Sequence, residues 1–284
     1  MWQKLAVLLE MIKFRHSVFA LPFALMALVL AAGGWPPLRV LFWVVVAMVS
    51  ARTAAMTFNR IVDRRFDAEN PRTAGRAIPA GLVGLKESWL LVLGSSALFF
   101  LACALINTCT LALSPFALGL VLFYSLTKRF TWLCHVVLGL ALGLAPVGGW
   151  VAMTDSFAGY PWSLSLGILL WVAGFDCIYA CLDADFDRQA GLCSMPARFG
   201  RKNSFRVAVI CHTLAFLLFT LTGLVMHLNG WYYLGIVLTA AALFYQHLIV
   251  KPDDLSRIKM SFFSMNGLIA LTLFLSTCLA LATA

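Results

Sequence analysis

Long apolar stretches recur along the whole chain, separated by short polar connections. A helix needs roughly 20 apolar residues to cross a bilayer. Nine stretches are close to this length, approximately at residues 16–32, 40–58, 88–106, 108–124, 132–152, 163–182, 206–226, 231–250 and 262–281. They lack the alternation of barrel strands, so we predict helices, which satisfy their own backbone hydrogen bonds in lipid. The pattern predicts an all-α polytopic membrane protein with nine transmembrane helices in a single domain, residues 1–284.

The composition supports a membrane protein. Hydrophobic residues make up 62% of the chain and charged residues only 12%, whereas about 25% of a soluble domain is charged. The net charge of +9 raises the question of nucleic-acid binding, but the basic residues lie in connections between apolar stretches rather than on a continuous polar face. Membrane topology and anionic lipid headgroups explain them better. The expected partner is therefore the lipid bilayer, with no nucleic acid.

The distribution of Lys and Arg predicts the orientation in the membrane. Nineteen of the 21 lie in the amino-terminal segment or in the connections after even-numbered stretches, whereas Arg39 lies in an opposite connection and Arg52 within a stretch. Because positively charged loops remain in the cytoplasm, we expect a cytoplasmic amino terminus and a carboxy terminus on the far side. No small-residue cleavage site follows the first stretch, so no removable signal peptide is expected. The predicted location is a bacterial inner membrane.

Five of the 12 acidic residues form two clusters at the cytoplasmic ends of predicted helices. The clusters contain Asn59, Asp63 and Asp67 after the second stretch, and Asp176, Asp183 and Asp187, joined by Tyr179, after the sixth. Spacings of four and seven residues keep each cluster on one face if the helix continues. Two carboxylates about 6 Å apart repel by roughly 2 to 3 kcal/mol at an effective dielectric near 20, so these clusters are expected to bind cations.

The donor types indicate which cation. Carboxylate and amide oxygens without Cys or His favour hard ions, and Mg²⁺ typically combines one or two carboxylates with phosphate oxygens. Two acidic helices would thus hold two Mg²⁺ ions around one diphosphate. The alternative is that each cluster is a solvated helix end, whose carboxylates pair with the neighbouring Arg64, Arg65 or Arg188.

Basic residues on the same side are candidates for binding phosphate. Arg72 follows the first cluster, and the segment from Tyr124 to Arg129, which includes Lys128, ends the fourth stretch. The planar guanidinium group is suited to phosphate oxygens. Similar candidates in the loops after the clusters are Arg76, Arg198 and Arg201. The alternative for each is a topology charge or a side chain that extends to the headgroups.

The order of these motifs across the nine stretches resembles the UbiA superfamily of intramembrane aromatic prenyltransferases. The most similar segments are RTAAMTFNRIVDRRFDAENPRT (52–73) and YACLDADFDRQAG (179–191). The resemblance implies nine helices around a central cavity and Mg²⁺-dependent transfer of a polyprenyl chain from polyprenyl diphosphate to an aromatic acid. FRHSVFALPF (14–23) and WVAGFD (171–176) are similar to the 4-hydroxybenzoate polyprenyltransferase branch, which acts in respiratory quinone (ubiquinone) synthesis. Relatives that prenylate 1,4-dihydroxy-6-naphthoate in menaquinone synthesis are the alternative.

The resemblance also implies roles for individual residues. Asn59, Asp63 and Asp67 would bind one Mg²⁺, and Asp183 with Asp187 the other. The expected catalytic residues are Asp63, Asp67, Asp183, Asp187, Lys128 and Asp176, and the expected substrate-binding residues include Asn59, Arg72, Tyr124, Arg129 and Tyr179. Their location near span ends, rather than the resemblance, adds Arg15 and His16 to the substrate-binding residues: with Asp176 they would position the aromatic acid, Arg15 pairing with its carboxylate and Asp176 accepting the phenolic proton. The alternative is that Arg15 is a topology charge and His16 an interfacial residue. One departure from the family pattern is Arg60, where many members have Asp.

An ion-coupled transporter is the alternative from a different class, because acidic residues within helices also occur at transport sites. Such acids usually lie near the bilayer midplane. Both clusters here lie at cytoplasmic helix ends beside basic loops, where a diphosphate made in the cytoplasm would arrive. Their depth therefore favours a transferase.

Overall fold

The computed structural model describes residues 7–8, 10–11 and 20–284, and nearly all of the regular structure in these residues is helical. The long helices are α3 (Leu38–Val62), α5 (Leu85–Ile106), α6 (Thr108–Thr127), α7 (Cys134–Thr154), α8 (Trp162–Tyr179), α11 (Arg201–Val225), α12 (Gly230–Ile249) and α14 (Asn266–Ala282). The shorter ones are α2 (Leu21–Ala32), α4 (Arg64–Glu69), α9 (Ala184–Gln189), α10 (Met195–Phe199) and α13 (Ile258–Met260). A 3₁₀ turn, η2 (Ala180–Leu182), extends α8, and a π-helical turn, η3 (Ser261–Met265), joins α13 to α14.

Eight helical stretches in the described residues are long and apolar enough to cross a membrane. The prediction of an all-α, multi-pass integral membrane protein is therefore confirmed. The first expected span, residues 16–32, is described only from residue 20 onward, and its helix α2 has 12 residues, fewer than one crossing requires. The described part of the chain thus contains eight membrane-length helices and one shorter apolar helix, rather than nine long ones.

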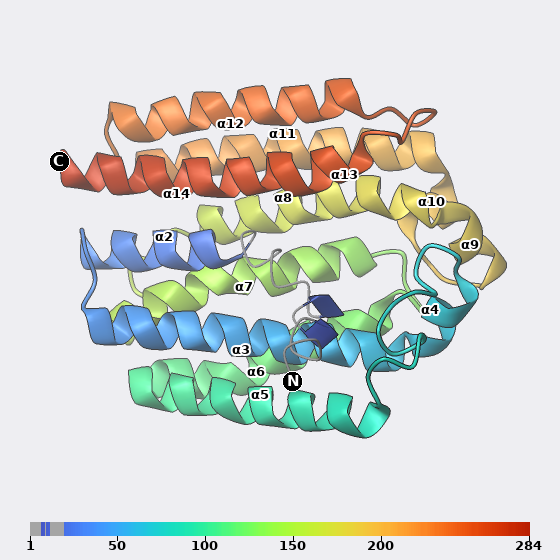
Figure 1. Ribbon diagram of the computed structural model, residues 1–284. Coiled ribbons are helices and arrows are strands. Elements are labelled where there is room, and N and C mark those ends of the chain that lie inside the picture. The colour runs from blue at the N-terminus through green and yellow to red at the C-terminus, as the bar shows by residue number, and fades with distance from the viewer. Residues whose placement is uncertain (1–6, 9, 12–19) are drawn as a thin grey trace.

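The long helices run side by side with alternating directions, and three of the short helices gather at one end (Figure 1). α4, α9 and α10 lie at the end where α3, α6 and α8 finish, while the carboxy terminus lies at the opposite end (Figure 1). α7 packs against α2, α6 and α8, and α3 packs against α5 and α6. This arrangement brings both acidic motifs to the same end of the bundle.

Glycines allow α7 to approach its neighbours closely. A Cβ atom on Gly139 would lie 2.2 Å from the carbonyl oxygen of Leu169 in α8, and one on Gly149 would lie 2.1 Å from that of Ala24 in α2. Small residues at helix contacts allow such close backbone approach in membrane proteins. The position of α7, which forms one wall of the site described below, therefore depends on these glycines.

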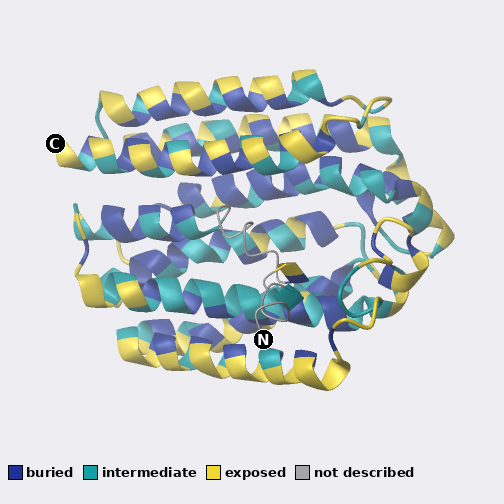
Figure 2. Cartoon of the chain, viewed as in Figure 1, coloured by how far each residue is buried: buried dark blue, intermediate teal, exposed yellow. Residues whose placement is uncertain are grey.

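Apolar side chains also cover the outside of the bundle, as expected of a surface in contact with lipid. Leu93 and Val237 are each 63% exposed, and Phe244 is 68% exposed, whereas the buried residues line the contacts between helices (Figure 2). Phe23 of α2 packs against Trp171 of α8, with ring centroids 5.3 Å apart, in the largest core cluster.

Candidate active site

The first acidic motif lies where α3 passes into α4. Asp63 alone separates the two helices, with φ −89° and ψ 1°. Its backbone N–H still donates to the carbonyl of Asn59 (3.0 Å), and its own carbonyl accepts from the N–H of Asp67 (2.8 Å). The helix is therefore interrupted at one residue, but its i, i+4 hydrogen bonds continue and keep the three side chains on one side.

The second motif has the same local structure. Asp183 alone separates η2 from α9, with φ −106° and ψ 5°, and its carbonyl accepts from the N–H of Asp187 (2.7 Å). In both motifs an aspartate occupies the break and a second aspartate follows one turn later. The two motifs share the four-residue spacing of their aspartates, Asp63 to Asp67 and Asp183 to Asp187, and the backbone structure is the same in both.

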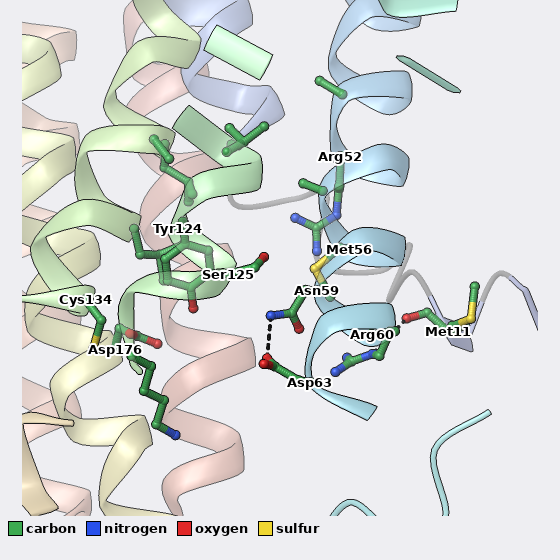
Figure 3. A pocket seen from close by; sticks show the side chains of 18 of the residues that line it. Met11, Arg52, Met56, Asn59, Arg60, Asp63, Tyr124, Ser125, Cys134 and Asp176 are labelled. Atoms are coloured by element: carbon green, nitrogen blue, oxygen red, sulfur yellow. Dashed lines mark hydrogen bonds between the residues drawn. The ribbon is translucent and has the colours of Figure 1, made fainter. Parts of the chain in front are cut away.

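A cavity of about 1260 Å³ lies between these motifs and extends along the bundle. Its lining includes all the predicted site residues that the structure describes, namely Asn59, Asp63, Asp67, Arg72, Tyr124, Lys128, Arg129, Asp176, Tyr179, Asp183 and Asp187. Arg15 and His16 lie outside the described residues. Figure 3 shows Asn59 of α3, and Asp63 directly after this helix, on the side that faces Tyr124 and Asp176. The structure therefore brings residues from four separated segments to one place.

Each of the four motif aspartates, two at the helix breaks and two one turn later, has a cationic partner. The pairs are Asp63 with Arg129 (3.3 Å), Asp67 with Arg76 (2.6 Å), Asp183 with Arg72, and Asp187 with Lys128 (2.7 Å). The alternative, that neighbouring arginines neutralise the clusters, is wrong for Arg188 and Arg64. Arg188 contacts Asp185 (3.4 Å), and Arg64 donates to the carbonyl of Ile61 (2.9 Å). The compensating charges come mainly from more distant segments.

The two break aspartates differ in their electrostatic surroundings. Burial raises the pKa of Asp63 above its ordinary value, and the hydrogen bond from Arg129 only partly opposes this effect. Burial also acts on Asp183, but the hydrogen bond and charge of Arg72 outweigh it and lower the pKa of that carboxyl. Arg72 grips both oxygens of Asp183, from Nε at 2.7 Å and from Nη2, and Asn70 donates to the same carboxylate (3.0 Å).

Two of the predicted phosphate-binding arginines do not reach this cavity. Arg201 donates to the exposed carboxylate of Asp185 (3.0 Å), and the guanidinium of Arg198 lies over the ring of Phe199. Neither residue lines the cavity. Arg76, by contrast, does line it. The basic loop after the first motif therefore contributes to the site, while the loop after the second does not contribute its arginines.

Away from the charged end, the cavity wall is mainly apolar, with Arg52, Thr110 and Ser114 as polar exceptions. α3, α5, α6 and α7 supply this part, which includes Val44 near the start of α3 and Ile106 at the end of α5. Since α3 and α5 run in opposite directions, these two residues mark the end of the bundle farthest from the motifs. A long apolar chain with an anionic head would fit such a space, with the head at the motifs.

Sequence analysis missed two residues in or beside this cavity. Arg52 lines it seven residues before Asn59, on the same face of α3 (Figure 3). The available signal was a charge within a predicted span, which generally marks function. His135 of α7 also lines the cavity and lies 2.6 Å from Asp176. Nothing in the sequence pattern links these two residues, which are 41 positions apart.

A membrane-embedded apolar cavity with acidic and basic groups at one end defines a protein that handles an amphipathic anion within the bilayer. The chain belongs to the UbiA prenyltransferase family, whose model matches residues 20–276. It is therefore a prenyltransferase-family enzyme, as the motifs predicted.

Curated relatives agree with this assignment. A 4-hydroxybenzoate octaprenyltransferase of Citrobacter koseri is 36% identical over 88% of this chain and 86% of its own. One of Aeromonas salmonicida is 33% identical over 85% of this chain and 83% of its own.

Solved structures share the fold. A UbiA homologue from Aeropyrum pernix is 36% identical, with a TM-score of 0.85 over 92% of this chain and 96% of its own. A UbiA homologue from Archaeoglobus fulgidus bound to GPP and Mg²⁺ is 19% identical, with a TM-score of 0.74 over 98% of this chain and 100% of its own. The latter likeness concerns the fold alone.

Proposed function

We propose that the protein transfers a polyprenyl chain from polyprenyl diphosphate to an aromatic acid, with Mg²⁺ as cofactor and 4-hydroxybenzoate as the favoured acceptor. The observation that carries this proposal is the pair of acidic motifs facing one cavity whose remaining wall is mainly apolar. The names of relatives at 33% and 36% identity support the acceptor. The product would enter respiratory quinone synthesis.

The donor atoms of the motifs fit Mg²⁺. Asn59, Asp63 and Asp67 would hold one ion, and Asp183 with Asp187 a second, through the oxygen ligands that this ion prefers. Asp67 is buried and its Oδ2 accepts no hydrogen bond from the described residues. Within these residues no three acidic, His or Cys side chains lie close enough to form a complete metal site. In Mg²⁺ sites in general, substrate phosphates supply part of the ligand set.

The cations beside the motifs would stabilise the departing diphosphate. Bound Mg²⁺ would neutralise negative charge as the allylic C–O bond breaks. Arg72 and Lys128 now pair with Asp183 and Asp187, so their donors lie within reach of a diphosphate held at the same carboxylates. Charge-assisted hydrogen bonds of this kind act most strongly where charge develops in the transition state. The apolar wall would hold the tail and keep water from the allylic cation.

The acceptor would bind deeper, between Arg52 and Asp176. A guanidinium suits the acceptor's carboxylate, and Arg52 lies in the wall two turns from Asn59. Asp176 would accept a hydrogen bond from the phenol and so increase the electron density of the ring carbon beside it. That carbon forms the new C–C bond as the C–O bond of the diphosphate breaks, and its proton then leaves. The prediction that Arg15 and His16 bind the acceptor concerns residues outside those that the structure describes.

The orientation is part of the same proposal. With nine crossings, as the sequence predicts, the two termini would lie on opposite sides of a bacterial inner membrane. Lys128, Arg129 and the arginines after both motifs lie at the motif end of the bundle. Positively charged ends face the cytoplasm, which is where the diphosphate substrate is made. Membership of the prenyltransferase family and this depth both favour a transferase over the transporter.

The test is an assay in membranes with Mg²⁺, a long-chain polyprenyl diphosphate and, in parallel, 4-hydroxybenzoate or 1,4-dihydroxy-6-naphthoate, with products identified by mass. A prenylated benzoate is expected. A prenylated naphthoate alone would overturn the acceptor and move the enzyme to menaquinone synthesis. The absence of both products and of EDTA-sensitive diphosphate release would overturn the proposed reaction.

A further inference from the structure

A buried histidine outside both acidic motifs contacts the carboxylate that we assign to the acceptor. His135 is 3% exposed, and its Nδ1 lies 2.6 Å from Oδ2 of Asp176. Among the described residues, His135 is the hydrogen-bond partner of this carboxylate. Since no hydrogen bond to Oδ1 is found within the described residues, Oδ1 can bind a ligand in the cavity that Asp176 lines.

The other ring nitrogen identifies the tautomer. The backbone N–H of Met195 donates to Nε2 of His135 (3.2 Å). A nitrogen that accepts a hydrogen bond carries no hydrogen, so the hydrogen of the neutral imidazole is on Nδ1 and is donated to Asp176. The ring is thus held at both nitrogens, and its orientation determines that of the carboxylate.

Residues 193–195 form hydrogen bonds both to His135 and to residues at the proposed diphosphate end of the site. The N–H of Cys193 donates to the carbonyl of Lys128 (2.7 Å), and the hydroxyl of Ser194 donates to Asp187 (2.6 Å). Met195, the next residue, bonds His135. Three consecutive residues therefore connect the second acidic motif with the Asp176 carboxylate.

We propose that His135 is a positioning residue for the transfer reaction: it orients Asp176 toward the acceptor, and residues 193–195 set its own orientation relative to the second motif. The proposal rests on the proposed function. It assigns His135 no contact with either substrate. Its effect is therefore expected on turnover with the acceptor, while the affinity for the diphosphate, held at Lys128 and Asp187 without the imidazole, is preserved.

The kinetic test compares His135→Ala with His135→Gln. Alanine removes both hydrogen bonds, whereas the glutamine amide can donate to Asp176 and accept from Met195. Misplacement of a group by about 1 Å can reduce a rate a hundredfold, so His135→Ala is expected to lower kcat on the order of ten- to a hundredfold. The KM for polyprenyl diphosphate should stay within about twofold, and His135→Gln should restore most of kcat. Equal losses in both variants, or parent kcat in the alanine variant, would overturn the proposal.

Two controls separate positioning from general damage. His212→Ala removes an equally buried imidazole (3% exposed), which bonds His247 and does not line the cavity, and it should retain the parent kcat per inserted protein. In an Asp176→Asn background, His135→Ala should cause little further loss, because its target is already altered. A full additional loss there would show that His135 acts elsewhere.

The tautomer can be tested without turnover. In protein labelled with ¹⁵N-histidine, the His135 resonances, assigned by their absence from His135→Gln, should show a protonated Nδ1 and an unprotonated Nε2. A protonated Nε2 would refute the hydrogen-bond arrangement even if neither acceptor is prenylated. Failure of the proposed function, which is seen as no product from the parent, is thus distinguished from failure of this inference.

Discussion

Replacement of Arg72 by alanine tests how the site stabilises the departing diphosphate. Arg72 donates to both oxygens of Asp183, and its guanidinium lies 5.7 Å from the centroid of the Tyr179 ring. In the proposed reaction the same donors bind diphosphate oxygens once Asp183 holds Mg²⁺. The substitution would therefore remove a positive charge from the place where negative charge develops.

The size of the effect follows from the geometry. Two unit charges 4 Å apart attract by about 4 kcal/mol at an effective dielectric of 20. If half a unit of charge develops on the leaving group, about 2 kcal/mol is specific to the transition state, which corresponds to roughly a thirtyfold change in kcat. The Arg72 side chain is 33% exposed, and solvent screening weakens the attraction. We therefore expect a fall of about ten- to thirtyfold.

The assay is the initial rate of prenylated product in membranes, at saturating acceptor and Mg²⁺, as polyprenyl diphosphate is varied. Arg72→Lys keeps the charge without the bidentate geometry, and its kcat should lie between those of Arg72→Ala and the parent. Arg188→Ala is the matched control, because Arg188 pairs with the exposed Asp185 outside this cavity. A raised KM with unchanged kcat for Arg72→Ala would mean that Arg72 binds ground and transition states equally, and this would refute the argument.

Three further outcomes are expected. Asp183→Ala should lower kcat at least about a hundredfold, whereas Asp185→Ala should not. Equal loss of kcat in the two variants would contradict the ligand assignment. EDTA should abolish the parent's activity until Mg²⁺ is restored. Asp63→Asn should inactivate the enzyme yet raise the Tm of Mg²⁺-free protein at neutral pH. Burial raises the pKa of Asp63, so its ionised form destabilises the fold of the parent. The gain in Tm should disappear as pH falls through that raised pKa, because Asp63 of the parent then becomes protonated. Gly149→Ala should reduce folded protein in size-exclusion profiles, because the new Cβ would lie 2.1 Å from a carbonyl oxygen of α2, whereas Gly148→Ala, with nothing within 4 Å, should not.

Hydrophobic patterning predicted most of the fold because membrane spans are specified by length and apolarity, both of which are local properties. The eight long helices correspond to predicted stretches. Features that depend on single residues were less accessible. The helix breaks at Asp63 and Asp183 occur without proline or glycine at either position, so nothing in the local pattern marks them.

The acidic motifs were predictable because their residues share one helix face and have a defined spacing. The pairing of each acid with a particular base was not, because ion pairs such as that between Arg72 and Asp183 join positions 111 residues apart. For the same reason neither His135 nor Asn70 was identified. Arg52 was identifiable in principle, because a charge inside a span is uncommon, but its direction relative to Asn59 became clear only when α3 was placed beside the cavity (Figure 3).

Arg60 shows how a departure from the family pattern can leave the proposed metal ligands in place. Its Nε donates to the carbonyl of Met11 (3.5 Å), and Asn59 still donates to Asp63 (2.9 Å) (Figure 3). Nη1 of Arg60 lies 4.0 Å from Oδ2 of Asp67, where it adds positive charge beside a buried carboxylate. The proposed ligands Asn59, Asp63 and Asp67 therefore keep their arrangement, while the first motif alone becomes less attractive to a free cation. Since a diphosphate brings its own negative charge, Mg²⁺ would bind at this motif together with the diphosphate rather than before it.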